Sequence, residues 1–474
     1  MKSGLFKTDL EVVNIGLEMF RNDLVKQGTK VNQVKFLPPA DGDEEVLKAL
    51  DYLDSDPIRR KIEAANKEAV ERIINSRPVL VGYDKAINVI PGMKKNMIIH
   101  AGPPIAWENM CGAMKGAVTG AIVFEGLAGD IEEAEKVAAS GEIEFSPCHE
   151  HSTVGAMAGV TSASMYVHIV ENKTYGNVSY TNLSEQLSKI LRMGANDQSV
   201  IDRLIWMRDV FGLKEAMEIA GEIDLRLLLS QALHMGDECH NRNVAGTTIL
   251  IQALSPYLLQ TNFSEKDKVD VLNFVASSDY FSGPTWMALA KNALDSAHGI
   301  EYSTILTTMA RNGVEFGIRV SGMDGNTWFT GPAQRVVGPL FAGFKPEDSG
   351  LDIGDSAITE TYGIGGFAMS AALAIVALVG GTVDDAINTS KKMYEITTTE
   401  NPNVTLPILN FKGIPTGIDL RKVLESSMLP VINTAIAHKD AGVGMIGAGI
   451  TNPPMECFKK AALALAAHIR ELDL

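Results

Sequence analysis

The sequence predicts a mixed α/β plus α+β protein of three regions. These are a Rossmann-like α/β domain with a hairpin extension over residues 1–176, a helical domain over 177–280 and an α+β domain over 281–474. Short apolar runs alternate with helical segments in the first region, proline is absent from residue 183 until Pro256, and strand and turn signals return after residue 282. A length of 474 residues, at roughly 150 residues per domain, agrees with three regions.

The first region predicts strands at residues 12–16, 31–37, 79–82 and 97–101, because each is a short apolar run. Helices at 17–27 and from Asp56-Pro57 to about residue 75 separate them. Apolar runs separated by helices are typical of a parallel sheet with helices on its faces.

The strand at 97–101 is followed by Gly102-Pro103-Pro104 and a helix from about Trp107. A glycine loop before a helix N-terminus is the general anion-binding arrangement, so we expect Gly102 to bind an anion. Gly112, Gly116 and Gly120 on that helix favour close packing of another backbone. A short helix capped by Asp130 and a hairpin of residues 165–171 and 178–181 complete the region.

Beyond the helical region, Ser264 predicts a further helix start, and residues 316–322 and 327–330 predict a hairpin. Residues 361–383 carry no charge and are long enough to span a bilayer. They are rich in glycine and alanine, are flanked by acidic residues and lack a Lys or Arg anchor, so we expect one buried helix and no membrane span.

Charge and cysteine usage exclude several classes of protein. With 42 Lys and Arg against 58 Asp and Glu, the net charge is −16, which disfavours nucleic-acid and membrane-surface binding. Four cysteines are scattered without a CxxC motif, and residues 1–10 lack an apolar export signal. We therefore expect a cytoplasmic protein.

Two histidine-containing segments are candidate sites. In Cys148-His149-Glu150-His151, an extended backbone would place His149 and His151 on one side, suited to catalysis or substrate contact. A metal site is less favoured because no third ligand follows at a diagnostic spacing, and a solvated loop without function stays open.

The second segment runs from His234 to Asn243. On a continuing helix His234, Glu238 and Arg242 would share a face. A solvated end stays open, but His, Asn and Arg orient ligands, so the sequence favours a site. We assign catalysis to Asp237 and His240; substrate binding goes to Asn241, Arg242 and Asn243, since a guanidinium fork suits a carboxylate or phosphate.

The last third adds Arg319 as a substrate-binding candidate. A turn containing Gly363, Gly365 and Gly366 could present N–H groups to an anion. The GxGxxG of residues 442–447 lacks the strand before it and the helix within it that a dinucleotide site needs. We expect a tight glycine loop there.

Several longer motifs resemble the YlbE/YahG-like family, which includes AllG, a subunit of oxamate carbamoyltransferase. They are NIGLEMF (14–20), PPADGD (38–43), PCHEHSTVGAMAG (147–159), GDECHNRN (236–243), RVSGMDGNTWFTGPA (319–333), DIGDSAITETYGIGGFAM (352–369), PTGID (415–419), AHKDAGVGMIGAG (437–449) and NPPMECF (452–458). The chain departs from the family at Phe36-Leu37 and at Ala156, which leaves room for a paralogue with another substrate.

The resemblance implies a subunit that helps convert oxalurate and phosphate to oxamate and carbamoyl phosphate. It also implies an FdrA-like subunit and a third subunit as partners. Phosphate is then a co-substrate, no other cofactor is certain, a divalent ion is not indicated but stays open, and we expect a homo-oligomer that binds a small anion. The alternatives are a non-catalytic assembly subunit and a small-acid or acyl-CoA enzyme of the same architecture.

Overall fold

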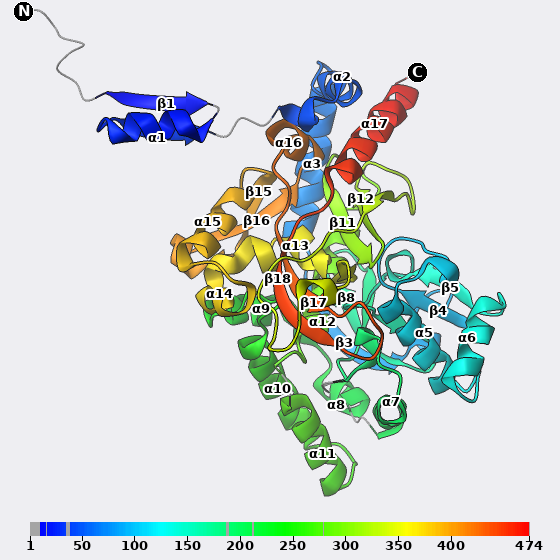
Figure 1. The fold of residues 1–474 in the computed structure, drawn as a ribbon. Coiled ribbons are helices and arrows are strands. Elements are labelled where there is room, and N and C mark those ends of the chain that lie inside the picture. Colours follow the sequence, from blue (N-terminus) through cyan, green and yellow to red (C-terminus); the bar gives the residue numbers. More distant parts are fainter. Residues whose placement is uncertain are drawn as a thin grey trace, which may run out of the picture.

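The computed structural model describes residues 10–15, 17–34, 38–185, 189–210, 213–277 and 279–473 (Figure 1). Its strands are β1 (Glu11–Ile15), β2 (Lys30–Val34), β3 (Pro78–Lys85), β4 (Met97–His100), β5 (Glu144–Pro147), β6 (Thr153–Val154), β7 (Val160–Thr161), β8 (Tyr166–Asn172), β9 (Val178–Asn182), β10 (Ile223–Asp224), β11 (Leu306–Asn312), β12 (Glu315–Val320), β13 (Phe329–Pro332), β14 (Ile353–Gly354), β15 (Thr397–Leu406), β16 (Lys412–Ile418), β17 (Ile432–Ala437) and β18 (Met445–Thr451).

The helices are α1 (Glu18–Lys26), α2 (Glu44–Leu53), α3 (Ile58–Asn75), α4 (Ala86–Val89), α5 (Gly112–Phe124), α6 (Ile131–Ala139), α7 (Gln198–Val210), α8 (Leu213–Ala220), α9 (Leu225–His234), α10 (Val244–Leu258), α11 (Glu265–Ala276), α12 (Gly283–Asp295), α13 (Ile358–Tyr362), α14 (Val376–Val379), α15 (Val383–Met393), α16 (Leu420–Ser426) and α17 (Met455–Leu472). The mixed α/β class is therefore confirmed. None of the described helices is long and apolar enough to cross a membrane.

Sheet topology does not confirm the Rossmann-like N-terminal domain. The described strands form six sheets, ordered β10-β3-β8-β9-β6, β13-β12-β11-β14, β5-β4-β7, β1-β2, β15-β16 and β17-β18. Within the described residues, parallel pairing is confined to β1–β2, β4–β5 and β6–β9. The predicted strands at 79–82 and 97–101 lie in different sheets, and the first pairs antiparallel with β8. An apolar run indicates burial on both faces but carries no information about strand direction.

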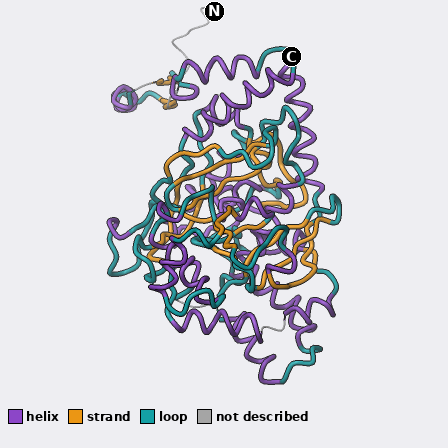
Figure 2. Tube along the Cα trace, turned by 90° about the vertical axis from the view of Figure 1, so that its right-hand side faces the viewer, coloured by secondary structure: helices purple, strands orange, loops and turns teal. Residues whose placement is uncertain are grey.

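The β1–α1–β2 unit stands away from the rest of the molecule in two perpendicular views (Figures 1 and 2). Its strands are parallel, and α1 has no buried residue. Two strands and one helix cannot bury enough apolar surface to fold independently. Residues 35–37 of the expected second strand, and with them Phe36-Leu37, lie outside the described residues.

The body is organised around α12, which lies near its centre (Figure 1) and is buried over most of its length. The largest apolar cluster joins residues from all three predicted regions, including Ala65, Leu229 and Ile414. The division at residues 176 and 280 stays a prediction.

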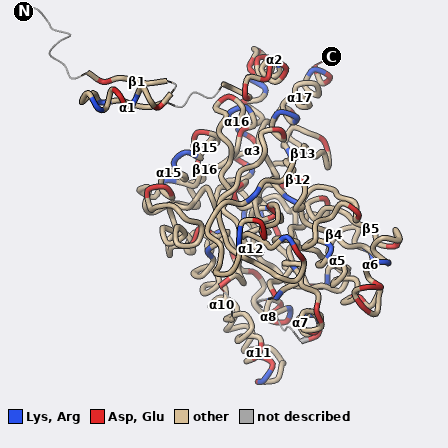
Figure 3. The backbone as a smooth tube through the Cα atoms, viewed as in Figure 1, with Lys and Arg blue, Asp and Glu red and all other residues tan. Residues whose placement is uncertain are grey.

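Acidic and basic residues both occur on outer helices such as α6 and α11 (Figure 3).

The expected single helix over residues 361–383 is wrong. The segment consists of the end of α13, a 3-10 segment η8 (Gly365–Ala371), a further 3-10 turn and α14. Gly363 and Gly365 have φ values of 115° and 62°, which a right-handed helix cannot contain. The expected burial holds for residues 361–370.

Other local predictions are confirmed. The two hairpins are β8–β9 and β12–β13, and the helix from Pro57 is α3. Asp130 and Ser264 cap α6 and α11, accepting hydrogen bonds from Glu133 N and Asp267 N. The GxGxxG lies at the β17–β18 turn and the start of β18, as expected of a glycine loop rather than a dinucleotide site.

Candidate functional site

A cavity of about 570 Å³ lies where the loop after α9 meets α12, the 3-10 turn η7 (Asp355–Ala357) and the β17–β18 hairpin. Its volume is sufficient for a small organic substrate together with a second ligand. The described lining residues are Ala156, Met157, Ile190, Arg192, Met193, Cys239, His240, Asn241, Ser277, Asp279, Tyr280, Gly283, Pro284, Met287, Phe341, Ser356, Thr359, Thr434, Ala435 and Met445.

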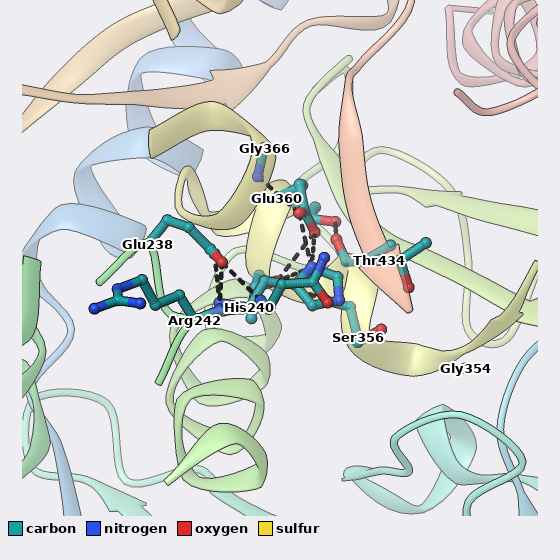
Figure 4. Close-up of polar contacts among 12 residues, drawn as sticks. Glu238, His240, Arg242, Gly354, Ser356, Glu360, Gly366 and Thr434 are labelled. Atoms are coloured by element: carbon teal, nitrogen blue, oxygen red, sulfur yellow. Dashed lines mark hydrogen bonds and ion pairs between the residues drawn. The ribbon is translucent and has the colours of Figure 1, made fainter. Parts of the chain in front are cut away.

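His240 and Glu360 form a close pair at the wall of this cavity (Figure 4). The Nδ1 atom of His240 lies 2.8 Å and 3.0 Å from the two carboxylate oxygens of Glu360. Glu360 is fully buried and also accepts a hydrogen bond of 2.8 Å from Gly366 N. Because a carboxylate oxygen accepts, Nδ1 carries the proton, and Nε2 of the neutral ring keeps its lone pair. This arrangement orients a histidine for proton transfer through Nε2.

The loop that positions His240 is organised by Glu238. A continuing helix, on which His234, Glu238 and Arg242 would share a face, is not formed, because α9 ends at His234 and Gly236 has φ 99°. The Glu238 carboxylate accepts hydrogen bonds of 2.6 to 2.7 Å from the backbone N–H groups of residues 240, 241 and 242. This buried side chain thus satisfies donors that a helix would have satisfied internally.

The other predicted residues of the loop have different surroundings. Asp237 is buried and accepts a hydrogen bond from Gly246 N in the first turn of α10. Asn241 lines the cavity, and its Nδ2 is buried without a described partner. Asn243 donates to the carbonyl of His240. Arg242 donates to the Gly236 carbonyl and extends away from Glu360 in Figure 4, so the structure does not bring it into the cavity.

Arg192 is a cavity residue that the sequence analysis missed. It is the one Lys or Arg among the described lining residues. Its Nη2 donates to Ser184 Oγ over 2.8 Å, and its Nε lies 3.6 Å from a Glu185 carboxylate oxygen. No motif surrounds it in the sequence, so only its place in the lining of the same cavity as His240 and Asn241 identifies it.

The glycine turns do bind anions, but these are carboxylates of the chain itself. Gly102 N and Gly155 N donate to the two oxygens of Asp355 over 2.7 Å and 2.8 Å. In the second turn, Gly366 N donates to Glu360 and Gly365 N to the Glu238 carbonyl, while Gly363 N donates to the carbonyls of residues 359 and 360. The geometry expected of an anion site is therefore present, yet these N–H groups are already satisfied.

The expected common orientation of His149 and His151 is wrong, because residues 148–151 form a 3-10 turn rather than an extended segment. His151 contacts the Pro91 carbonyl and Ser146 Oγ. His149 is fully buried, with Nε2 3.4 Å from Asp355, and burial lowers its pKa. Neither lines the cavity, so the structure does not bring them together with His240.

Arg319, like His149 and His151, lies away from the cavity. Its guanidinium carbon is 5.7 Å from the centre of the Trp328 ring, and Nη2 contacts His298 Nε2 over 3.0 Å and Asn326 Oδ1 over 3.2 Å. It does not line the cavity. In the part of the chain that the structure describes, no group of three or more His, Cys, Asp or Glu is placed to hold a metal ion.

Comparison with known proteins identifies the family. The chain is 68% identical over 465 residues, 98% of each protein, to the uncharacterised protein YahG of Escherichia coli (strain K12). It is 42% identical over 407 residues to oxamate carbamoyltransferase subunit AllG of the same organism, covering 85% of this chain and 97% of that protein. The chain belongs to the YahG/AllG family.

Two further comparisons agree with membership of the YahG/AllG family. The family model for oxamate carbamoyltransferase subunit AllG matches residues 143–356, which include the His240 loop. A crystal structure of a conserved protein of unknown function from Enterococcus faecalis V583 superposes with a TM-score of 0.85 at 70% identity, covering 86% of this chain and 98% of that one.

Gly365→Ala tests how closely the glycine turn approaches the His240–Glu360 pair. Gly365 has φ 62°, and an added Cβ would overlap Glu360 Oε1 and lie 3.0 Å from Cβ of His240. We expect a loss of about 1–3 kcal/mol in the free energy of unfolding from backbone strain, which the control shares, and a further loss from the clash with Glu360, together with displacement of His240. Gly299→Ala is the matched control, since its φ is 79° but nothing lies within 4 Å of the added atom. Equal urea midpoints for the two variants would contradict the clash.

Burial of Glu238 gives a pH-dependent contribution to stability. Burial raises its pKa from 4.5 to about 7, against the opposing effect of its N–H donors. Below pH 4.5 this contribution is fully present, and it is lost as pH rises towards and through about 7. We expect the urea midpoint of the native protein to fall relative to that of Glu238→Gln between pH 5 and pH 8. A pH-independent difference would contradict this, and the exposed Glu132→Gln serves as control.

Proposed function

We propose that this chain is a substrate-binding and catalytic subunit of a carbamoyltransferase complex that converts oxalurate and phosphate to oxamate and carbamoyl phosphate. The observation that carries the proposal is the His240–Glu360 pair at the wall of a cavity that also contains Arg192. The 42% identity to oxamate carbamoyltransferase subunit AllG supports the choice of reaction.

In the proposed reaction, a phosphate oxygen attacks the ureido carbonyl carbon of oxalurate. The new C–O bond forms as the bond from that carbon to the oxamate nitrogen breaks. Hydrogen phosphate loses one proton, and the departing nitrogen gains one. His240 Nε2 accepts the first proton and donates it to the nitrogen, so the histidine returns to its starting state. Glu360, on Nδ1, holds the tautomer and stabilises the protonated ring.

Binding of the oxamate carboxylate is assigned to Arg192, because a guanidinium offers a bidentate fork. The unpartnered Nδ2 of Asn241 is suited to donate to a substrate carbonyl. Arg242 and Arg319, which do not line the cavity, receive no substrate contact in this proposal. An FdrA-like subunit and a third subunit are the proposed partners, and a cytoplasmic homo-oligomer is the proposed state.

A thermal-shift experiment tests ligand class directly, because ligands that bind the native state raise its midpoint. Oxamate, oxalurate, carbamoyl phosphate and coenzyme A are compared on the native chain, Arg192→Ala and Arg470→Ala. Arg470 is the control, because it belongs to α17 and its guanidinium lies over the Tyr52 ring. We expect oxamate and oxalurate to stabilise the native chain and Arg470→Ala, and to lose that effect in Arg192→Ala. Stabilisation by coenzyme A alone would favour an acyl-CoA enzyme. If no ligand stabilises the chain, an assembly subunit is favoured.

A further inference from the structure

The cavity contains little positive charge for the reaction proposed above, on which this inference rests. Arg192 is the only described Lys or Arg in its lining, and Asp279 lines it as well. Arg192 is itself partly neutralised, because Glu185 lies 3.6 Å from its Nε. The buried Glu238 and Glu360 also contact His240, the first through its backbone N–H group and the second through its ring Nδ1.

The proposed substrates carry more negative charge than this lining can balance. Oxalurate brings one carboxylate, and phosphate carries about two negative charges near neutral pH. Enzymes that transfer groups to phosphate hold it with Arg, Lys, a metal ion or grouped backbone N–H donors. The glycine N–H groups next to the site are already bonded to Asp355, Glu360 and a carbonyl, and the described residues contain no metal-binding group.

Exposed apolar side chains follow the β17–β18 hairpin, and one of them also lines the cavity. We define the rim as Val337, Phe341 and Val443, which are 75%, 45% and 42% exposed. Phe341 also lines the cavity, and its backbone N–H donates to the Ile446 carbonyl on β18 over 2.7 Å. Val337 pairs with Ile450, which lies on β18 as well. Exposed large apolar side chains that follow one hairpin in this way are typical of a protein interface.

We propose that a different subunit docks on the rim and extends a Lys or Arg side chain into the cavity, where it binds the phosphate co-substrate. Charge decides the occupant: the chain has a net charge of −16, so a basic surface on a different subunit is complementary to it. The site is then complete only in the assembled complex. The chain alone binds the small acid, and phosphate binds only after the partner has docked.

The test uses the full chain alone and the complex formed with the FdrA-like subunit. Inorganic phosphate and oxamate are titrated separately, each with and without Mg²⁺, and thermal midpoints are recorded. For the chain alone we expect a shift with oxamate and none with phosphate. The complex is expected to bind phosphate at least tenfold more tightly than the chain alone, independently of Mg²⁺.

Val337→Glu places a charge on the rim without altering a residue that lines the cavity. Phe411→Glu is the control, because Phe411 is 61% exposed but belongs to the β15–β16 turn. We expect Val337→Glu to lose co-elution with the partner and phosphate binding while keeping the oxamate shift. Phe411→Glu keeps all three.

Four results would overturn the inference. They are phosphate binding by the chain alone, phosphate binding that requires Mg²⁺, an intact complex with Val337→Glu, and a rim buried by a second copy of the chain. Failure of oxamate to stabilise any sample would instead count against the proposed function, so the two failures are distinguishable.

Discussion

Replacing His240 with alanine is expected to lower the turnover of oxalurate phosphorolysis by the assembled complex by about 10²- to 10⁴-fold, the usual contribution of a positioned acid–base group. The imidazole is held through Nδ1 by the buried Glu360 and is the only histidine among the described cavity residues. Its removal abolishes proton transfer to the departing nitrogen but leaves Arg192 in place. The decrease should therefore appear in kcat, with KM for oxalurate changed by less than about threefold.

His234→Ala is the matched control. His234 ends α9 only six positions earlier, but its Nε2 contacts Thr405 Oγ1 and it does not line the cavity. Turnover in this variant should stay within twofold of the native value. Thermal midpoints of both variants establish that each is folded. Full activity of the His240→Ala complex would show that the chemistry resides elsewhere, as expected for an assembly subunit.

Replacing Asp352 with alanine is expected to reduce the free energy of unfolding by about 3–5 kcal/mol. Asp352 accepts two hydrogen bonds of 2.7 Å and 2.8 Å from the guanidinium of Arg311, and both side chains are buried. The same guanidinium donates to the Gly354 carbonyl, Ser356 Oγ and Thr434 Oγ1. Removing Asp352 leaves a buried charge without its counterion, while Ser356 and Thr434 of the cavity wall lose their fixed donor.

Urea denaturation measures this loss, and Glu222→Ala is its control. Glu222 pairs with Arg77 at the surface, where both side chains are about half exposed. Exposed pairs contribute about 0–1 kcal/mol, so the control should barely change the midpoint. A loss below about 1 kcal/mol for Asp352→Ala would show that solvent reaches the guanidinium. The double variant Arg311→Met/Asp352→Ala should recover part of the stability.

Local structure was predictable wherever the deciding interactions are close in sequence. Capping by Asp130 and Ser264, the two hairpins and α3 were all predicted, because side-chain caps and turn residues act within four positions. Sheet pairing was not, since β3 pairs with β8 more than eighty residues later in the chain. Apolar patterning carries no record of which partner or direction a strand takes.

The candidate site shows the same division. The polar loop around His240 was predicted to be functional, and the structure places His240 and Asn241 on a cavity. Its geometry was missed, because Glu238 replaces helical hydrogen bonds with its own carboxylate. Arg192 was missed because its cavity is formed with residues about fifty positions away in the sequence. Glu360 was counted only among the acidic residues that flank the uncharged segment 361–383, whereas it is the partner of His240.

The carboxylates of Asp355 and Glu360 can be regarded as tethered occupants of two receptor-like turns. Because each is covalently attached, its effective concentration at the glycine N–H groups exceeds that of any dissolved anion in the cell. Salts and metabolites therefore cannot compete for these turns. Shortening Glu360 to alanine would leave a space shaped for acetate or formate, so the orientation of His240 becomes a property that an added solute restores and a wash removes.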